Sequence, residues 1–272
     1  MGIRGDTIDL HQWRHRRRVA RGECVFRDVP RLKGEYDSAD DGDRRENGPE
    51  SSPVRFWWWN RFVPGDDATL VEPLENELLR ASYGLGENGP ALLAAHFDSP
   101  NVRHRVLALR GLVRQSLVDA DLWLRALSDE HVEIRREALQ QFAHAPLEDD
   151  AVLDEVVRRL RDSDDLVVEG AAFALGEHLW ANAVDELCDV ATNHDDARCR
   201  ESAVAALGAI GDDRARATII NALKDKPAVR RRAIVALSNF EGPDVETALD
   251  QAGDDQDWQV RSAVTQLRNT ER

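Results

Sequence analysis

An amphipathic helical pattern in residues 195–211 recurs along most of the chain. In this stretch Cys199, Ala203 and Leu207 fall on one helical face, because residues three or four positions apart share a face. Aspartates precede the pattern and Gly211 follows it, as is typical of the start and end of a helix. We call Cys199 the anchor of this copy. In the central copies a small residue follows the anchor by four positions and a large apolar residue by eight.

The anchors recur at an almost constant spacing of 32, 33, 32, 30 and 31 residues. They are Val102, Ile134, Val167, Cys199, Val229 and Val260. In the first and last copies the large residue, Leu109 or Leu267, comes seven positions after the anchor. A period in the low thirties with one visible helix per copy predicts stacked repeats that share a core along an axis.

Each copy is predicted to hold an outer helix, a short aspartate-containing turn and an inner helix. The predicted outer helices span roughly 90–97, 118–127, 150–161, 182–192, 213–224 and 243–251. The inner helices span roughly 101–112, 132–143, 166–178, 198–209, 228–239 and 258–269. Residues 72–84 form a first, incomplete repeat, so the predicted solenoid covers 72–272.

The shared pattern Asp…Val-Arg-x-x-Ala-x-x-Ala-Leu-Gly-x-Ile-Gly resembles HEAT repeats, specifically the short subclass first described in phycobilisome lyases. The resemblance covers about residues 72–272. It implies an all-α, right-handed solenoid of about six helical pairs, preceded here by an irregular N-terminal extension. A repeat pattern is specific for fold and says almost nothing about activity.

The resemblance also implies a role for the arginine that follows most anchors, with Val168 as the exception. This arginine is expected to pair with the turn aspartate of a neighbouring repeat, which forms a structural ladder. The ladder set is Arg103, Arg135, Arg200, Arg230 and Arg261. Further basic residues on the inner helices are expected to line a concave face that accepts an acidic peptide or a phosphate backbone. These are His104, Arg105, Arg136, Arg231 and Arg232.

The N-terminal extension divides into three predicted segments. Residues 1–33 form a basic arm, and residues 1–36 carry about +4 whereas the remaining chain carries −19. The arm either contacts an anionic partner or docks on its own acidic solenoid. Its candidate contact residues are Trp13, Arg14, Arg16, Arg17 and Arg18. Residues 34–53 are polar, acidic and almost free of apolar side chains, which predicts a flexible linker.

The third segment, 54–71, contains Trp57, Trp58 and Trp59 in succession. No secondary structure buries three successive side chains on one face, so at least one of them has another contact. The segment either caps the open end of the solenoid or anchors a partner or a membrane interface.

Two enzyme classes with HEAT-like repeats are not supported. Diiron hydroxylases use His-Glu dipeptides at equivalent repeat positions, but here the order is reversed and the positions differ, in Glu130-His131 and Glu177-His178. DNA glycosylases use aromatic side chains in a basic cleft. The tryptophans here are scattered as if for packing: Trp123, Trp180 and Trp258. No metal cluster, phosphate loop or cofactor motif is recognised.

Composition adds a prediction about the environment. The net charge is −15, and only three residues are lysine, a balance that resembles proteins of salt-loving archaea. Cys188 and Cys199 are predicted to be buried thiols in a reducing compartment, and no apolar run is long enough to cross a membrane. We therefore expect a cytoplasmic protein.

The expected function is a non-enzymatic scaffold, adaptor or accessory subunit that binds a protein partner through the concave face and the arm. One alternative is an RNA- or ribosome-associated protein that uses the basic arm and the tryptophans. A further alternative is a peripheral subunit of a membrane complex.

Overall fold

The computed structural model describes residues 73–86, 88–145 and 149–270, so the predicted arm, linker and Trp-rich segment lie outside the described residues. The described residues form α-helices and two short 3₁₀ helices, and no strand. The inner helices are α3 (Pro73–Ser82), α5 (Val102–Arg114), α7 (Val132–Phe142), α9 (Asp165–Glu177), α11 (Ala197–Ile210), α13 (Pro227–Leu237) and α15 (Trp258–Thr270). The outer helices are α4 (Gly89–Phe97), α6 (Ala120–Leu127), α8 (Asp150–Arg159), α10 (Val184–Asn193), α12 (Arg216–Ala222) and α14 (Pro243–Ala252).

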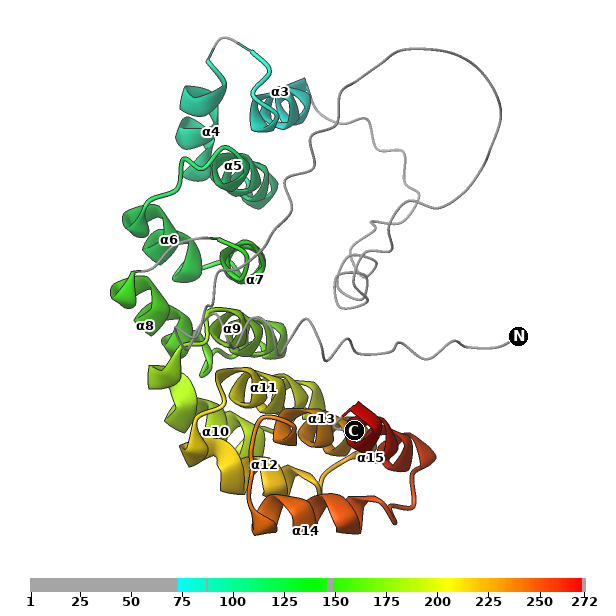
Figure 1. Cartoon of the computed structure of the whole chain (residues 1–272). Helices are drawn as coiled ribbons and strands as arrows, with labels where there is room; N and C mark the ends of the chain where they lie inside the picture. The colour runs from blue at the N-terminus through cyan, green and yellow to red at the C-terminus, as the bar shows by residue number, and fades with distance from the viewer. Residues whose placement is uncertain (1–72, 87, 146–148, 271–272) are drawn as a thin grey trace, which may run out of the picture. The chain divides into compact units, whose positions relative to one another are not determined.

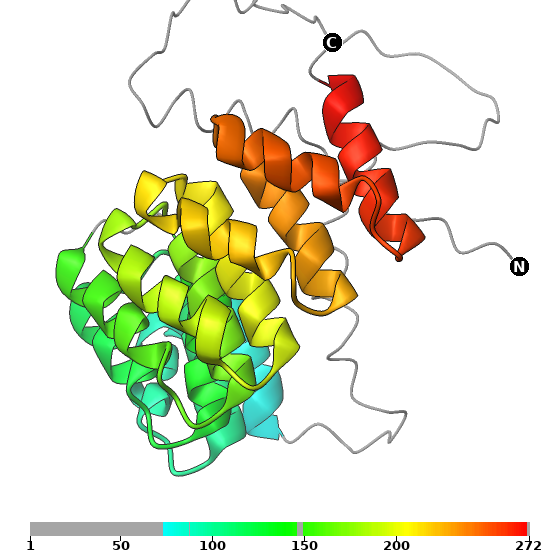
Figure 2. The same cartoon turned by 90° about the horizontal axis from the view of Figure 1, so that it is seen from below.

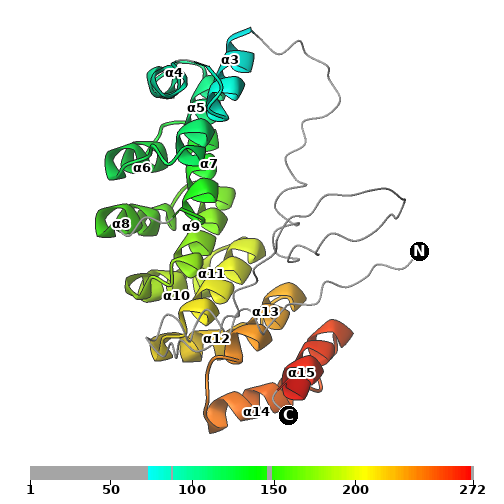
Figure 3. The same ribbon diagram turned by 45° about the horizontal axis from the view of Figure 1, so that its top comes forward.

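Successive outer and inner helices form six pairs, from pair 1 (α4 and α5) to pair 6 (α14 and α15), and α3 is an additional inner helix. Figures 1 and 3 show the inner helices stacked in one layer and the outer helices beside them in a second layer. Helix α11, for example, packs against its outer partner α10 and against the inner helices α9 and α13. From below, α14 and α15 (orange and red) continue the stack beyond α13 (Figure 2). The predicted all-α solenoid of six pairs is confirmed.

The core follows the predicted repeat of anchor, small residue and large residue. In α7, for example, Ile134, Ala138 and Phe142 have no exposed surface. Positions 0, 4 and 8 of a helix lie on one side, which here faces the outer layer. Small residues at the middle position let the two layers approach each other.

The predicted register is wrong in pair 1. Val102 is half-buried, whereas His104, Ala108 and Leu112 are buried. The anchor of α5 is therefore His104, two residues later than predicted, and the first spacing shortens from 32 to 30 residues. The prediction took the only β-branched apolar residue at the start of the helix as the anchor. A histidine instead fills this position, with Ser99 and Asn101 beside its ring nitrogens.

Glycine allows the inner helices of the central pairs to approach closely. A Cβ atom on Gly208 would lie 2.5 Å from Ala236 Cβ and 2.7 Å from Ala236 Cα. A Cβ on Gly176 would lie 2.9 Å from Ala206 Cα. Because the obstacles are Cα atoms and an alanine Cβ whose position the backbone fixes, no side-chain rearrangement can make room. The glycines therefore set the distances from α9 to α11 and from α11 to α13.

Pair 6 carries polar side chains at the helix positions that face the next pair elsewhere in the stack. In inner helices, the positions one and five after the anchor face the next pair, and in α13 they hold the buried Arg230 and Ile234. In α15 the same positions hold Arg261 and Thr265, both exposed. Trp258 at the start of α15 is 66% exposed, so the expectation that it serves packing is wrong. Among the described helices, none has the length and apolar character that crossing a membrane requires.

Candidate functional site

Buried arginines join successive pairs along the edge where the turns lie. Arg135 Nε and Nη2 each donate to the Asp162 carboxylate over 2.8 Å, and its Nη1 donates to the Asp129 carbonyl over 2.9 Å. One guanidinium thus joins the turn of its own pair to the turn of the next pair. We call this set of contacts the Arg–Asp ladder.

The same arrangement recurs at three more junctions. The further pairs are Arg105–Asp129, Arg200–Asp225 and Arg230–Asp255, with nitrogen–oxygen distances of 2.6–3.0 Å. All of these side chains are mostly buried. Paired planar donors and carboxylates of this kind are stronger than neutral hydrogen bonds and fix the relative position of the two turns. The ladder arginines therefore stabilise the stack and are engaged within the chain.

Two members of the predicted ladder are wrong. Arg103 is 64% exposed and pairs with Glu75 of α3, whereas Arg105 holds the ladder position of pair 1. This is the same two-residue register difference that places the anchor at His104. Arg261 donates to the carbonyls of Asp255 and Gln256 in its own turn, and among the described residues it has no aspartate of a following turn to bind.

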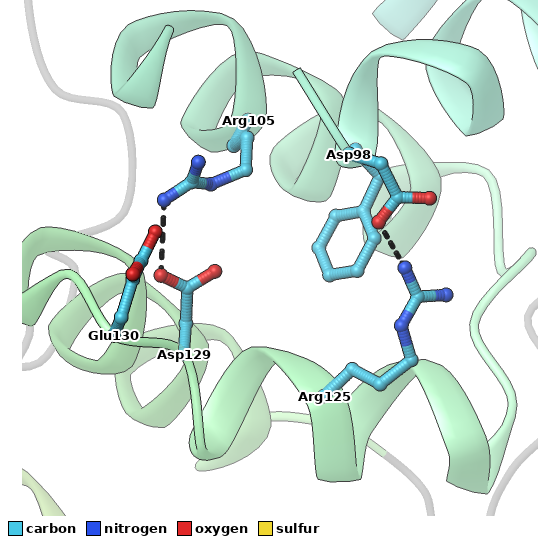
Figure 4. Close-up of a pocket in the computed structure, with 6 residues that line it drawn as sticks. Asp98, Arg105, Arg125, Asp129 and Glu130 are labelled. Carbon is cyan, nitrogen blue, oxygen red and sulfur yellow. Dashed lines mark hydrogen bonds and ion pairs between the residues drawn. The ribbon is translucent and has the colours of Figure 1, made fainter. Parts of the chain in front are cut away.

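A polar cavity of about 210 Å³ lies between the turns of pairs 1 and 2. Figure 4 shows the ladder contact of Arg105 with Asp129 on one side of it and the ion pair of Arg125 with Asp98 on the other. Arg125 also lies over the Phe97 ring, 5.0 Å from its centroid. The cavity is thus a crevice beside the ladder, and most of its charged groups already contact one another.

The ladder is interrupted between pairs 3 and 4. Val168, fully buried, replaces the arginine, and His194 takes the place of the turn aspartate, five residues before its anchor. His194 Nδ1 accepts the backbone N–H of Asp196 over 3.1 Å. Three ladder aspartates accept the same bond from the residue two positions on: Asp129, Asp162 and Asp255. The histidine thus keeps the turn-forming role of the aspartate, but the negative charge of the aspartate is absent.

Restoring this junction tests whether the ladder positions are equivalent. Val168→Arg alone should destabilise the fold by about 2–4 kcal/mol, since it buries a charge without a partner. Adding His194→Asp should recover at least 1 kcal/mol or so of that loss, a coupling typical of contacting residues. Urea unfolding of the two single variants and the double variant measures this coupling. Additive losses would show that position 168 does not face position 194.

The turn aspartates also predict how stability depends on pH. Hydrogen bonds from Arg200 and Arg230 lower the pKa values of Asp225 and Asp255, and those from the Arg198 side chain and backbone lower the pKa of Asp196 to about 2. Their stabilising contribution is complete above the unfolded aspartate pKa of about 3.9 and is lost as the pH falls through the folded values. Urea unfolding should show no change from these groups between about pH 7 and pH 5, and a progressive loss below about pH 4. Asp225→Asn should make this acid loss less steep; an unchanged slope would contradict the assignment.

The side of the inner layer that points away from the outer layer carries two rows of side chains. Positions two and six after each anchor point away from the outer layer, because positions 0, 4 and 8 face it. The first row is Val106, Arg136, Glu169, Glu201, Arg231 and Ser262. The second row is Arg110, Gln140, Phe173, Ala205, Val235 and Gln266. These side chains are half-buried or exposed. The surface they form, the inner face, is the candidate functional site.

The inner face is not the line of unengaged arginines that the sequence predicted. His104 and Arg105 are buried in pair 1. Arg136 makes two bonds to Asp164, at 2.9 and 2.5 Å, and Arg232 contacts Glu201 at 3.2 Å. Arg231 donates to Gln259 over 3.0 Å. An acidic ligand would therefore have to displace contacts within the chain. The other predicted binding residues, in the arm and at Trp57–Trp59, lie outside the described residues.

Two features of the inner face were missed in the sequence. Arg110 Nε and Nη2 bind the buried Glu137 carboxylate over 2.7 and 2.6 Å, which raises the pKa of Arg110. Phe173, Ala205 and Val235 follow one another in the second row, on the adjacent helices α9, α11 and α13. We call these three side chains the apolar patch. The residues at position six after each anchor would have revealed it, since the anchors of these helices were assigned correctly.

The two Glu-His dipeptides lie in different settings. His131 precedes α7 beside Asp129, whereas His178 ends α9 and stacks on Phe142 with a centroid distance of 4.6 Å. The two thiols also differ: Cys199 is buried, but Cys188 is only half-buried, which corrects the prediction for Cys188. Burial and nearby carboxylates raise the pKa of Cys199 to about 12, so it is a neutral thiol at pH 7.

Comparison with known proteins supports the repeat fold. A family model described as HEAT repeats matches residues 184–268, which span pairs 4 to 6. Among curated proteins, none matches the chain.

Solved structures share the arrangement of helices at low sequence identity. An engineered protein is 19% identical with a TM-score of 0.50, and the match covers 68% of this chain and 97% of that one. A structure of the complex of CpcE and CpcF of phycocyanin lyase from Nostoc sp. PCC7120 contains a chain that is 21% identical, with a TM-score of 0.50 and coverage of 64% and 74%. A designed armadillo repeat protein is 17% identical with a TM-score of 0.49 and coverage of 67% and 99%. The chain thus has an α-helical repeat fold, with HEAT repeats recognised over residues 184–268.

Proposed function

We propose that this protein is a non-enzymatic scaffold or accessory subunit that binds a segment of a protein partner on its inner face. The observation that carries the proposal is the apolar patch of Phe173, Ala205 and Val235 on three adjacent helices. Partly exposed apolar side chains beside polar ones are typical of the centre of a protein interface. The small Ala205 between two larger residues leaves room for a side chain of the partner.

The charges around this apolar patch favour a protein partner over a nucleic acid. Glu169 and Glu201 stand in the first row on α9 and α11, next to Phe173 and Ala205. Carboxylates repel phosphate groups, and the arginines of the inner face already contact groups within the chain. An RNA-binding function would therefore depend on the basic arm, residues 1–33, whereas a protein segment can use the inner face directly.

The arm and the segment 54–71 are part of the same proposal as a second contact region. The basic charge of residues 1–36 and the three successive tryptophans support it. We also infer a cytoplasmic protein adapted to high salt, on the strength of the net charge of −15 and the scarcity of lysine. In molar salt, phosphate contacts weaken steeply while apolar burial persists, which again favours a protein partner.

A matched pair of alanine-to-arginine substitutions tests the inner face. Ala205→Arg places a bulky charged side chain in the middle of the apolar patch. Ala217→Arg makes the same change on the exposed side of α12 in the outer layer. Tagged full-length protein is recovered from a native high-salt lysate, and co-purifying proteins are quantified. Ala205→Arg should lose the stoichiometric partner, while Ala217→Arg should retain it.

Thermal unfolding of both variants checks that each remains folded, and deletion of residues 1–65 tests the second region separately. Partner recovery that is equal in both arginine variants would refute binding on the inner face. Recovery that survives the deletion would remove the arm from the proposal. Nuclease-sensitive RNA, instead of a protein, would support the RNA-binding alternative.

A further inference from the structure

Three metal-ligating side chains converge where the Arg–Asp ladder is interrupted. Asp165, His194 and Cys199 each offer one ligand atom, and these atoms all lie within 4.8 Å of one another. They come from both sides of the junction: Asp165 begins α9 in pair 3, whereas His194 and Cys199 belong to the turn and the inner helix of pair 4.

The cluster lies at the one described junction between pairs 1 and 6 where the ladder arginine is replaced, by Val168. At the next junction Arg200 donates to the carbonyl of His194 in its own turn and to Asp225 in the following turn. Between pairs 3 and 4, Val168 supplies no cation, and the groups facing each other across the two turns are Asp165 and His194. The junction thus lacks the positive charge that joins the turns at the other junctions.

The spacing of the three groups suits a small tetrahedral ion. His194 Nε2 lies 3.9 Å from Asp165 Oδ1, and Cys199 Sγ lies 3.2 Å from the Asp165 carbonyl oxygen. Zinc bonds of about 2.0–2.3 Å in a tetrahedron put ligand atoms about 3.3–3.8 Å apart, so the groups need to contract by about 1.5 Å or less. Cys199 is fully buried at the base, while the Asp165 side chain is 54% exposed and gives access from solvent.

The surrounding charges also favour a cation. The carboxylates of Asp196 and Glu169 lie close enough to act electrostatically on the Cys199 thiol, together with that of Asp165. Two basic residues lie nearby, and both are already engaged: Arg198 is bound to Asp196 over 2.6 Å, and Arg200 donates to the His194 carbonyl and to Asp225. A set of sulfur, imidazole and carboxylate ligands selects zinc-like ions, whereas magnesium and calcium prefer sites made of oxygen alone.

We propose that Asp165, His194 and Cys199 bind one zinc-like divalent cation, which joins pairs 3 and 4 in place of the ladder guanidinium. Three protein ligands leave the fourth position for a water molecule. The ion displaces the Cys199 proton to solvent as the metal–sulfur bond forms. Ligation through His194 Nε2 places the imidazole proton on Nδ1, so the hydrogen bond from the Asp196 N–H is released.

Cobalt(II) is the probe for this site, because a cobalt–thiolate bond gives a near-ultraviolet charge-transfer band. Purified full-length protein, treated with EDTA and then dialysed, is titrated with cobalt chloride in the absence of any partner. One equivalent should produce the band, and zinc chloride should abolish it by displacing cobalt. Cys199→Ala should lose the band, while His194→Gln and Asp165→Asn should weaken binding at least about tenfold.

Cys188→Ala and Cys24→Ala are the matched controls, and both should keep the band. The thermal midpoint provides a second readout: zinc should raise it for the parent protein and leave it unchanged for Cys199→Ala, because only the folded site binds. No band with the parent protein, or a band that persists in Cys199→Ala, would overturn the proposal. Undiminished binding by His194→Gln would overturn the ligand set. Since no partner is present, these outcomes are independent of the proposed scaffold function.

Discussion

Arg230→Ala lowers the free energy of unfolding by about 3 kcal/mol, because it leaves the mostly buried Asp255 carboxylate without its partner. The same change removes the bond from Arg230 Nη1 to the Asp225 carbonyl, so two turns lose their connection. The expected result is a lower urea midpoint with an unchanged denaturant slope, as measured by circular dichroism.

Arg231→Ala is the control, since it removes the same side chain one position along α13. Arg231 is half-exposed and donates one bond to the exposed Gln259, so the expected change is about 0.5 kcal/mol or less. Equal losses of unfolding free energy in the two variants would show that the ladder contact stabilises the fold no more than an exposed contact does. A loss in Arg230→Ala that disappears when Asp255 is also replaced by asparagine would identify the unpaired carboxylate as the cause.

Gly208→Ala destabilises the protein by about 2 kcal/mol, although alanine is the better helix former. The added methyl would lie 2.7 Å from Ala236 Cα, so α11 and α13 must move apart. Because α11 also packs on α9 through Gly176, the displacement cannot be absorbed on the other side without a second clash. Chemical denaturation of the variant and the parent protein measures the loss.

Gly170→Ala provides the matched control within the same layer. A Cβ there would lie 3.4 Å from Leu139 Cβ, an ordinary contact, so the helix preference should give a gain of up to about 1 kcal/mol. A gain at both positions would mean that α11 and α13 separate without cost. A loss at both would mean that the inner layer tolerates no added atom.

The repeat alone predicted most of the fold. The anchors Ile134, Val167, Cys199 and Val229 are all buried, and the helices that contain them begin and end within a few residues of the predicted limits. Periodicity was sufficient there because each copy has the same neighbours on both sides, so one pattern satisfies every pair. The anchor of pair 1 was assigned to the wrong residue because a histidine fills that position. A pattern of apolar residues does not include histidine.

The candidate site was less predictable, because it depends on partners far apart in the sequence. Arg136 and Arg232 have the spacing of groove residues, yet each meets a carboxylate, at Asp164 and Glu201, on a neighbouring pair. A sequence shows which side of a helix a residue occupies, but it does not show which opposite charge lies across the junction.

The sequence by itself determined the repeat, the number of pairs and the side of each inner helix that faces the core, since these follow from local periodicity. Only the tertiary structure decided which arginine joins which turn, and that His194 stands where an aspartate would complete the ladder. The reason is physical: burial follows the helical period, whereas ion pairs and ligand sets need atoms within a few ångströms of one another. Stacking decides that distance, and it brings Asp165 to His194 and Cys199, about 30 residues away in the chain.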